Sequence, residues 1–230
     1  MKKNKKVDSV NILIYLGIAI ICMASIYYAN KLLGKLGLTI TFIAMSTISF
    51  ILTFKYVTLS TINLNSNCFP YVTMLTSLYL LLETASKKET KEIVNLNFIA
   101  NIFTAVMLYI MINYTQILID TISINMKNVF DSNSRILLVY PLTTLLSNYL
   151  SIWTYDKIKK LYDNHFISIV TIYLLVGIVE GIIYTFLCYR NILNIKTIIL
   201  ILLSSYMIRL IITVIYSLFL IITSKKKVIS

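Results

Sequence analysis

Two long apolar runs, each with one charged residue near its middle, constrain this chain more than any other feature. Glu180 lies in the run 166–189, and Arg209 lies in the run 197–222. Each run is longer than the roughly 20 apolar residues that cross a bilayer as a helix. A charge at bilayer depth costs several kcal/mol unless it is paired or faces a polar cavity. The two residues therefore mark either a structural ion pair between helices or a cavity that binds a solute.

Five further runs have the same apolar character. The seven candidate spans are 10–30, 38–59, 69–84, 93–113, 134–155, 166–189 and 197–222. Composition agrees, because 58% of the 230 residues are hydrophobic and 13% are charged, whereas a soluble domain carries about 25% charged residues. The third run is short, so the sequence predicts an all-α, polytopic transmembrane helical bundle of six or seven spans. Residues 1–230 form a single integral membrane domain in this interpretation.

The uncharged polar segment 59–69 separates the second and third runs. It is either a short loop or a non-helical segment that lines a cavity, because unwound backbone at membrane depth is tolerated only in such places. Lys55 lies about one turn inside the predicted second span. Its long side chain either snorkels to the interface or contributes to a polar site.

Lysine and arginine residues gather at the ends of the apolar runs and give the chain a net charge of +12. The N-terminal tail and the second, fourth and sixth loops carry eight of them; the other loops and the C-terminal tail carry eleven. Because cytoplasmic loops are enriched in these residues, we expect a cytoplasmic C-terminus. Seven spans then place the N-terminus outside, although its four lysines oppose that orientation. No soluble basic face remains, which argues against nucleic acid as a partner.

No catalytic pattern stands out in the sequence. There is no GxSxG, HExxH or P-loop motif, and five glycines are too few for a nucleotide-binding loop. The one histidine and three cysteines show no metal-ligand spacing. We therefore expect no enzyme activity, no cofactor and no metal site.

Polar residues recur along one face of the run 134–155. Thr144, Ser147, Asn148 and Ser151 follow a spacing of three or four residues. Such a stripe either bonds to other helices or lines a cavity, and the amide of Asn148 favours a cavity because it both donates and accepts hydrogen bonds. Glu180 stands inside a G-x-x-x-G pattern, which lets two transmembrane helices approach closely.

Two residues of the third run have structural alternatives. Glu83 is followed at a spacing of four by Lys87, so the two form a surface pair or Glu83 belongs to a binding site. Tyr79 either packs against other helices or stacks on a flat aromatic solute.

Four stretches carry a family resemblance. They are KLLGKLGLTITFIAMST at 31–47, ETASKKETKE at 83–92, SRILLVYPLTTLLSNYLSIWTYDKIKKL at 134–161 and SSYMIRLIITVIYSLF at 204–219. Through them the chain resembles the queuosine precursor transporter family, also described as vitamin-uptake-like transporters, as a divergent member. The similarity is to the longer form with an additional N-terminal span.

The presumed ligand residues depart from the family pattern more than the scaffold does. Glu83 matches the family's Glu-x-Tyr-Gly-Lys-Lys, whereas Tyr79 stands where the family has an acid. Asn148 replaces a Gln, Glu180 replaces an Asp, and Arg209 replaces a Lys.

The resemblance implies import of a small polar metabolite, a queuosine precursor or related modified nucleobase, across the bacterial plasma membrane. In this interpretation Glu180 accepts hydrogen bonds from ring N–H groups, Asn148 recognises a base edge, and Arg209 keeps Glu180 ionised. The candidate substrate-binding residues are Asn148, Glu180, Arg209, Glu83, Lys55, Ser147 and Tyr79. Besides the solute and the lipid bilayer, a second copy of the chain or an energy-coupling partner is compatible with this reading. One alternative is a non-transport membrane scaffold or immunity-type protein, and another is the substrate-binding subunit of a shared ATP-driven uptake module.

Overall fold

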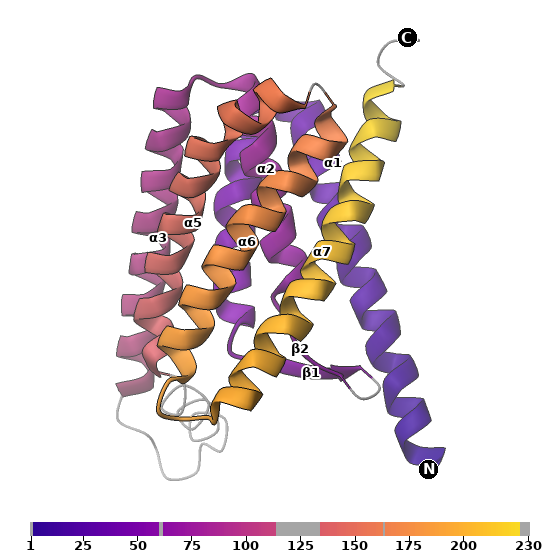
Figure 1. Cartoon of the computed structure of the whole chain (residues 1–230), viewed down its shortest axis with the longest axis vertical. Helices are drawn as coiled ribbons and strands as arrows, with labels where there is room; N and C mark the ends of the chain where they lie inside the picture. Colours follow the sequence, from indigo (N-terminus) through magenta and orange to yellow (C-terminus); the bar gives the residue numbers. More distant parts are fainter. Residues whose placement is uncertain (1, 60–61, 114–133, 163, 226–230) are drawn as a thin grey trace.

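The computed structural model describes residues 2–59, 62–113, 134–162 and 164–225, which form a bundle of long helices (Figure 1). The elements are α1 (Lys2–Leu52), β1 (Tyr56–Leu59), β2 (Ile62–Asn65), α2 (Cys68–Thr84), α3 (Lys87–Asn113), α5 (Ser134–Leu161), α6 (His165–Tyr189) and α7 (Ile195–Lys225). The expected all-α fold class is confirmed. The two strands pair antiparallel with Tyr56 opposite Asn65, and they are the only strands in the part of the chain that is described.

Helix α1 folds back on itself at Gly34 and so contains two antiparallel halves. Gly34 has φ 54° and ψ −127°, a conformation that glycine adopts without steric cost. A Cβ added at Gly37 would lie 2.0 Å from the backbone oxygen of Ala29, whereas eight residues of straight helix span about 12 Å. Figure 1 shows the first half rising from the N-terminus and the second half descending. The halves correspond to the first two predicted spans.

The second predicted span was too long at its C-terminal end. It was expected to reach residue 59, but α1 ends at Leu52 and residues 56–59 form a strand. Polar groups beyond the helix bind the carbonyls at its end. Asn65 Nδ2 donates to the Thr53 oxygen at 3.1 Å, and Ser66 N donates to the Lys55 oxygen at 3.0 Å.

The fourth predicted span begins earlier in the structure than in the sequence reading. It was placed at 93–113, but α3 starts at Lys87. Ser86 and Glu89 form a reciprocal N-terminal cap, in which Glu89 N donates to Ser86 Oγ at 3.2 Å and Ser86 N donates to Glu89 Oε2 at 3.0 Å. Such a cap satisfies two backbone donors at a helix start, which favours helix over a charged loop. The predicted connector 114–133 lies outside the described residues.

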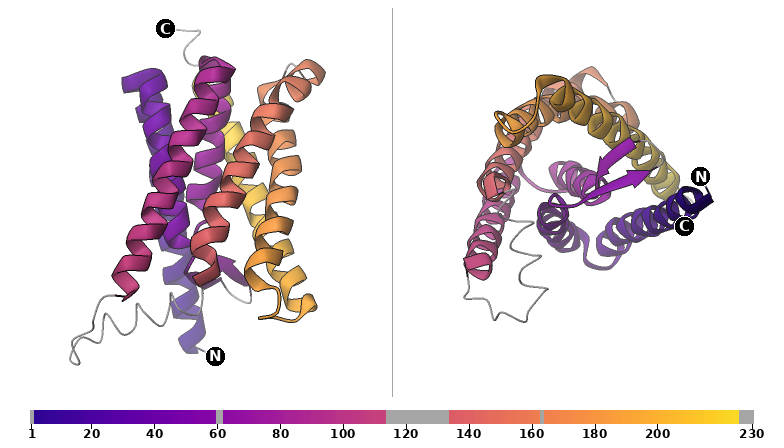
Figure 2. Two further views of the ribbon diagram at one scale, coloured as in Figure 1. Left: turned by 90° about the vertical axis from the view of Figure 1, so that its left-hand side faces the viewer. Right: turned by 90° about the horizontal axis from the view of Figure 1, so that it is seen from below.

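Within the described ranges, five segments are long and apolar enough to cross a membrane. They are Leu13–Leu52, Lys87–Asn113, Ser134–Leu161, Phe166–Tyr189 and Ile195–Leu220. The segment Leu13–Leu52 contains most of both halves of α1, so two of the predicted spans are counted here as one segment. Helix α2 has only 17 residues, or about 25 Å of helix, and lies among the other elements (Figure 2). Its buried side chains include Tyr71, Met74 and Leu78, so α2 forms the core of the bundle.

The bundle has two distinct ends (Figure 1). The start of α1 and the β-hairpin lie at one end, which we call the N-terminal end, and the end of α7 lies at the other, which we call the C-terminal end. The turn at Gly34 and the α2–α3 and α5–α6 connections share the C-terminal end, where three ion pairs join them: Lys35–Glu89, Lys87–Asp156 and Lys159–Glu83. The loops grouped together by their charges therefore lie on one face, and its cytoplasmic location stays a prediction.

Candidate functional site

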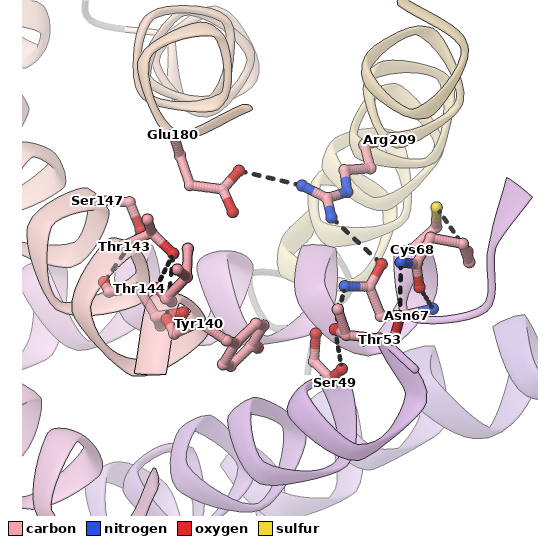
Figure 3. A network of polar contacts seen from close by, with 12 residues as sticks. Ser49, Thr53, Asn67, Cys68, Tyr140, Thr143, Thr144, Ser147, Glu180 and Arg209 are labelled. Carbon is pink, nitrogen blue, oxygen red and sulfur yellow. Dashed lines mark hydrogen bonds and ion pairs between the residues drawn. The ribbon is translucent and has the colours of Figure 1, made fainter. Parts of the chain in front are cut away.

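Arg209 and Glu180 face each other inside the bundle, as their position at mid-membrane depth predicts. Arg209 Nη1 donates to Glu180 Oε2 at 3.1 Å. Arg209 Nη2 donates to Asn67 Oδ1 at 3.2 Å, so one guanidinium links α7 to α6 and to the start of α2 (Figure 3). Arg209 is 7% exposed and Glu180 is 3% exposed. The charges are therefore removed from lipid and from water together, as a pair.

The ring of Tyr71 supports the guanidinium from α2. The central carbon of the Arg209 guanidinium lies 4.1 Å from the centroid of this fully buried ring. A cation over an aromatic face is attracted by the ring's negative charge density, most strongly where water is absent. We call Arg209, Glu180, Asn67 and Tyr71 the Arg209 cluster.

Asn67 is held in place by the end of α1 and by the β-hairpin. Its Nδ2 donates to Thr53 Oγ1 at 2.8 Å, and Thr53 Oγ1 donates to the Ser49 oxygen at 2.7 Å. Its backbone N donates to Asn65 Oδ1 at 3.1 Å. The polar segment 59–69 thus supplies non-helical backbone that positions a buried amide. Sequence reasoning missed Asn67, although its polar neighbours just before an apolar run were a signal.

The G-x-x-x-G pattern brings α6 and α7 close together, as expected. A Cβ added at Gly181 would lie 2.9 Å from Leu202 Cδ1, and one at Gly177 would lie 3.4 Å from the ring of Tyr206. The first contact is with the end of a flexible side chain, which can shift, and the second has an ordinary van der Waals length. The glycines therefore lie in a closely packed contact between the two helices.

The polar stripe of α5 is buried and turns toward the same region. Figure 3 shows Ser147 and Thr144 on the side of α5 that faces Glu180. Ser147 Oγ donates to the Thr144 oxygen at 3.0 Å, and Ser151 Oγ donates to the Ser147 oxygen at 2.9 Å, so these hydroxyls bond to their own helix.

Asn148 belongs to this stripe and is fully buried. Among the described residues, neither its Nδ2 nor its Oδ1 has a hydrogen-bond partner. A buried polar group without a partner costs about 1–3 kcal/mol. The amide therefore has an unused capacity to donate and accept inside the bundle.

The remaining candidate residues lie away from the Arg209 cluster. Tyr79 packs edge-to-face against Tyr155, with ring centroids 5.6 Å apart. Glu83 contacts Lys159 at 3.7 Å at the C-terminal end. The placement of Lys55 inside a helix was wrong, because α1 ends three residues before it. Lys55 is also exposed.

Two small cavities lie between the helices. The N-side cavity is bounded mainly by α6 and α7 and includes Gly181, Thr185, Ser205 and Arg209 in its wall. The C-side cavity is lined by residues that include Thr76, Tyr79, Ser151, Tyr173 and Thr213. Each encloses about 20 Å³, which is room for about one water molecule. Arg209 lines the N-side cavity; Glu180 and Asn148 line neither of the two.

Comparison with known proteins identifies the family of the chain. A family model described as "putative vitamin uptake transporter" matches residues 66–223. No curated protein and no solved structure matches the sequence. The matched region contains Asn67, Glu180 and Arg209, whereas α1 and both strands of the hairpin precede it. The chain therefore belongs to the vitamin uptake transporter family.

Proposed function

We propose that this membrane protein imports a small, flat, polar metabolite, a queuosine precursor or related modified nucleobase, across the bacterial plasma membrane. The observation that carries the proposal is the buried ion pair of Arg209 and Glu180, set at mid-bundle in a member of an uptake family. Charged residues inside membrane helices commonly mark solute pathways, because their cost is otherwise hard to sustain.

Unused hydrogen-bonding groups in the buried interior of the bundle support a polar solute. Within the described residues, Arg209 Nε has no hydrogen-bond partner, and neither side-chain atom of Asn148 has one. Together they offer a cationic donor, a neutral donor and a neutral acceptor. The edge of a purine-like ring presents matching acceptors and donors. Aromatic rings such as Tyr173 and Tyr206, which stack on each other here, are the kind of surface on which a flat solute also stacks.

The direct test measures uptake of radiolabelled deazaguanine precursors and queuine by cells that lack their own transporter. Cells producing this chain should accumulate at least one of these compounds above vector controls. Excess unlabelled compound should compete, whereas an unrelated solute such as an amino acid should not. Failure of well-produced protein to take up any of them removes the nucleobase assignment.

The scaffold alternative has its own supporting observation, which is that Glu180 and Arg209 satisfy each other and Glu180 lines neither cavity. A binding measurement on purified protein separates the two functions. A transported nucleobase should raise the unfolding temperature of the protein, because a ligand that binds only the folded state stabilises it. If the protein is a scaffold, none of the tested nucleobases should raise its unfolding temperature.

The subunit alternative is tested in the same uptake assay. A self-contained carrier should give uptake when this chain is produced alone in a distant host. Uptake that appears only when energy-coupling proteins from the native host are added favours a shared ATP-driven module.

The membrane orientation is tested with reporter fusions. We expect fusions at the C-terminus and within 156–165 to report the cytoplasm, because the C-terminal end carries the larger lysine excess. An external signal from either fusion contradicts this orientation.

A further inference from the structure

The N-side and C-side cavities follow one another along the bundle axis. On α6, the C-side cavity contacts residues between 169 and 176, and the N-side cavity contacts residues between 177 and 189. On α7, which runs in the opposite direction, Thr213 lines the C-side cavity and residues between 201 and 209 line the N-side cavity. Two antiparallel helices therefore give the same order, with one cavity toward each end of the bundle.

Two stacked tyrosines separate the cavities. Tyr173 lines the C-side cavity and Tyr206 lines the N-side cavity. Their ring centroids are 6.4 Å apart and the ring planes differ by 12°. Tyr206 OH donates to the Leu174 oxygen at 3.3 Å, which ties α7 to α6 at this level. Gly177 lies against both rings, since an added Cβ would be 3.4 Å from Tyr206 and 3.5 Å from Tyr173.

Arg209 stands at the same level and faces the N-side cavity. It lines that cavity, while its Nη atoms are engaged by Glu180 and Asn67. Its Nε has no hydrogen-bond partner within the described ranges. A solute in the N-side cavity would thus find one charged donor unsatisfied at its inner wall. Hydroxyl groups of Thr185 and Ser205 also line this cavity.

We propose that the N-side cavity is the docking site for the solute, that the C-side cavity receives it, and that Tyr173, Tyr206 and Arg209 form the barrier between them. This inference rests on the proposed transport function and deepens it. The solute presents a hydrogen-bond acceptor, a carbonyl, carboxylate or ring nitrogen, to Arg209 Nε. Each cavity has room for about one water molecule, so passage requires the two rings to separate, and the Tyr206–Leu174 bond breaks as they do.

Cysteine accessibility tests the order of the cavities without knowledge of the solute. The three native cysteines are first replaced by serine or alanine, and single cysteines are then introduced by Ser205→Cys and Ser151→Cys, one per cavity. A charged, membrane-impermeant methanethiosulfonate is added to one side of sealed vesicles. Ser205→Cys should react only from the side of the N-terminal end and Ser151→Cys only from the opposite side.

Matched controls come from neighbouring serines outside the two cavity walls. Ser204→Cys controls for Ser205→Cys, and Ser147→Cys, one turn away on α5 and equally buried, controls for Ser151→Cys. Each cavity cysteine should react at least about tenfold faster than its control, because the reactive thiolate forms only where water enters. Reaction of both cavity cysteines from one side, or at the rates of their controls, overturns the proposal.

The barrier itself is tested by changing Tyr206 in the Ser151→Cys background. Tyr206→Ala removes the stacked ring and should make the cysteine reactive from both sides. Tyr206→Phe keeps the ring and should preserve one-sided labelling. One-sided labelling in a folded Tyr206→Ala protein refutes the barrier; if that variant is not recovered, Tyr206→Leu serves in its place. Labelling needs no substrate, so the labelling and uptake experiments can fail independently. Unexpected labelling with normal uptake would refute the barrier and leave the transport function standing. Expected labelling without nucleobase uptake would refute the nucleobase assignment and leave the barrier standing.

Discussion

The Arg209 cluster and the C-terminal end of the bundle both contain ion pairs, but their surroundings are opposite. The Arg209 and Glu180 side chains are 9% and 2% exposed, whereas those of Lys87 and Asp156 are 50% and 46% exposed. In an exposed pair, each charge interacts with water almost as favourably as with its partner, so the pair contributes little to the free energy of folding. A buried pair has lost that water, and removing one partner leaves an uncompensated charge. Burial therefore sets the energetic role of each pair. Of these two pairs, only the buried one carries a large desolvation cost, and such a cost suggests a function.

The largest effect is expected from Arg209→Leu. The change leaves the Glu180 carboxylate and the Asn67 amide without their shared donor, which should destabilise the folded protein by about 3–5 kcal/mol. Uptake should be lost as well. Thermal unfolding in detergent and the yield of extracted protein measure the first effect. Arg190→Leu is the control, because it removes the same group from an exposed position at the N-terminal end. Equal stability of the two variants would mean that the buried pair contributes no more to the free energy of folding than an exposed arginine does.

Glu180→Gln should damage uptake more than stability. The amide keeps the shape of the side chain and one acceptor for Arg209, so the close packing at Gly177 and Gly181 should survive. It loses the charge, and charge-assisted hydrogen bonds are roughly twice as strong as neutral ones. We expect uptake to fall at least about tenfold, which corresponds to about 1.4 kcal/mol.

The control for this variant is Glu89→Gln, which makes the same change in the exposed pair with Lys35. It should leave uptake unchanged. Normal uptake by well-produced Glu180→Gln would remove Glu180 from the binding site and favour the scaffold alternative.

Asn148→Leu should also lower uptake, and it should do so without any loss of stability. The leucine has nearly the same shape and replaces an amide that has no partner among the described residues, so stability should stay equal or rise by about 1 kcal/mol. Uptake should fall, because the solute loses a donor and an acceptor. Thr154→Ala is the control, since that buried hydroxyl of α5 bonds to its own helix at 2.8 Å and is not one of the candidate binding residues. A clear loss of stability in Asn148→Leu would show that the amide has a structural partner.

Much of the bundle and the central pair follow from the sequence, because one physical cost determines both. Long apolar runs must become helices in a membrane, and two charges inside such runs must find each other or water. The partner of Arg209 at the N-terminal cap of α2 could not be predicted in this way. Asn67 lies 142 residues from Arg209 along the chain, and only tertiary packing brings the two together. Lys55 was misplaced for the same reason, because Asn65 and Ser66, more than ten positions away, bind carbonyls of the turn that follows α1.

The smallest effect is expected from Lys87→Gln, which breaks the exposed pair with Asp156. Stability should change by no more than about 1 kcal/mol, and added salt should reduce even that, because ions screen exposed charges. Uptake should not change, since Lys87 lies at the C-terminal end at the start of α3, a helix that carries no residue of the Arg209 cluster. Lys88→Gln removes a neighbouring positive charge and controls for the change in net charge. Thermal unfolding of both variants at low and high salt makes the measurement. A loss in Lys87→Gln as large as that in Arg209→Leu would abolish the distinction between exposed and buried pairs, because it would mean that this end of the bundle, and not the Arg209 cluster, holds the helices together.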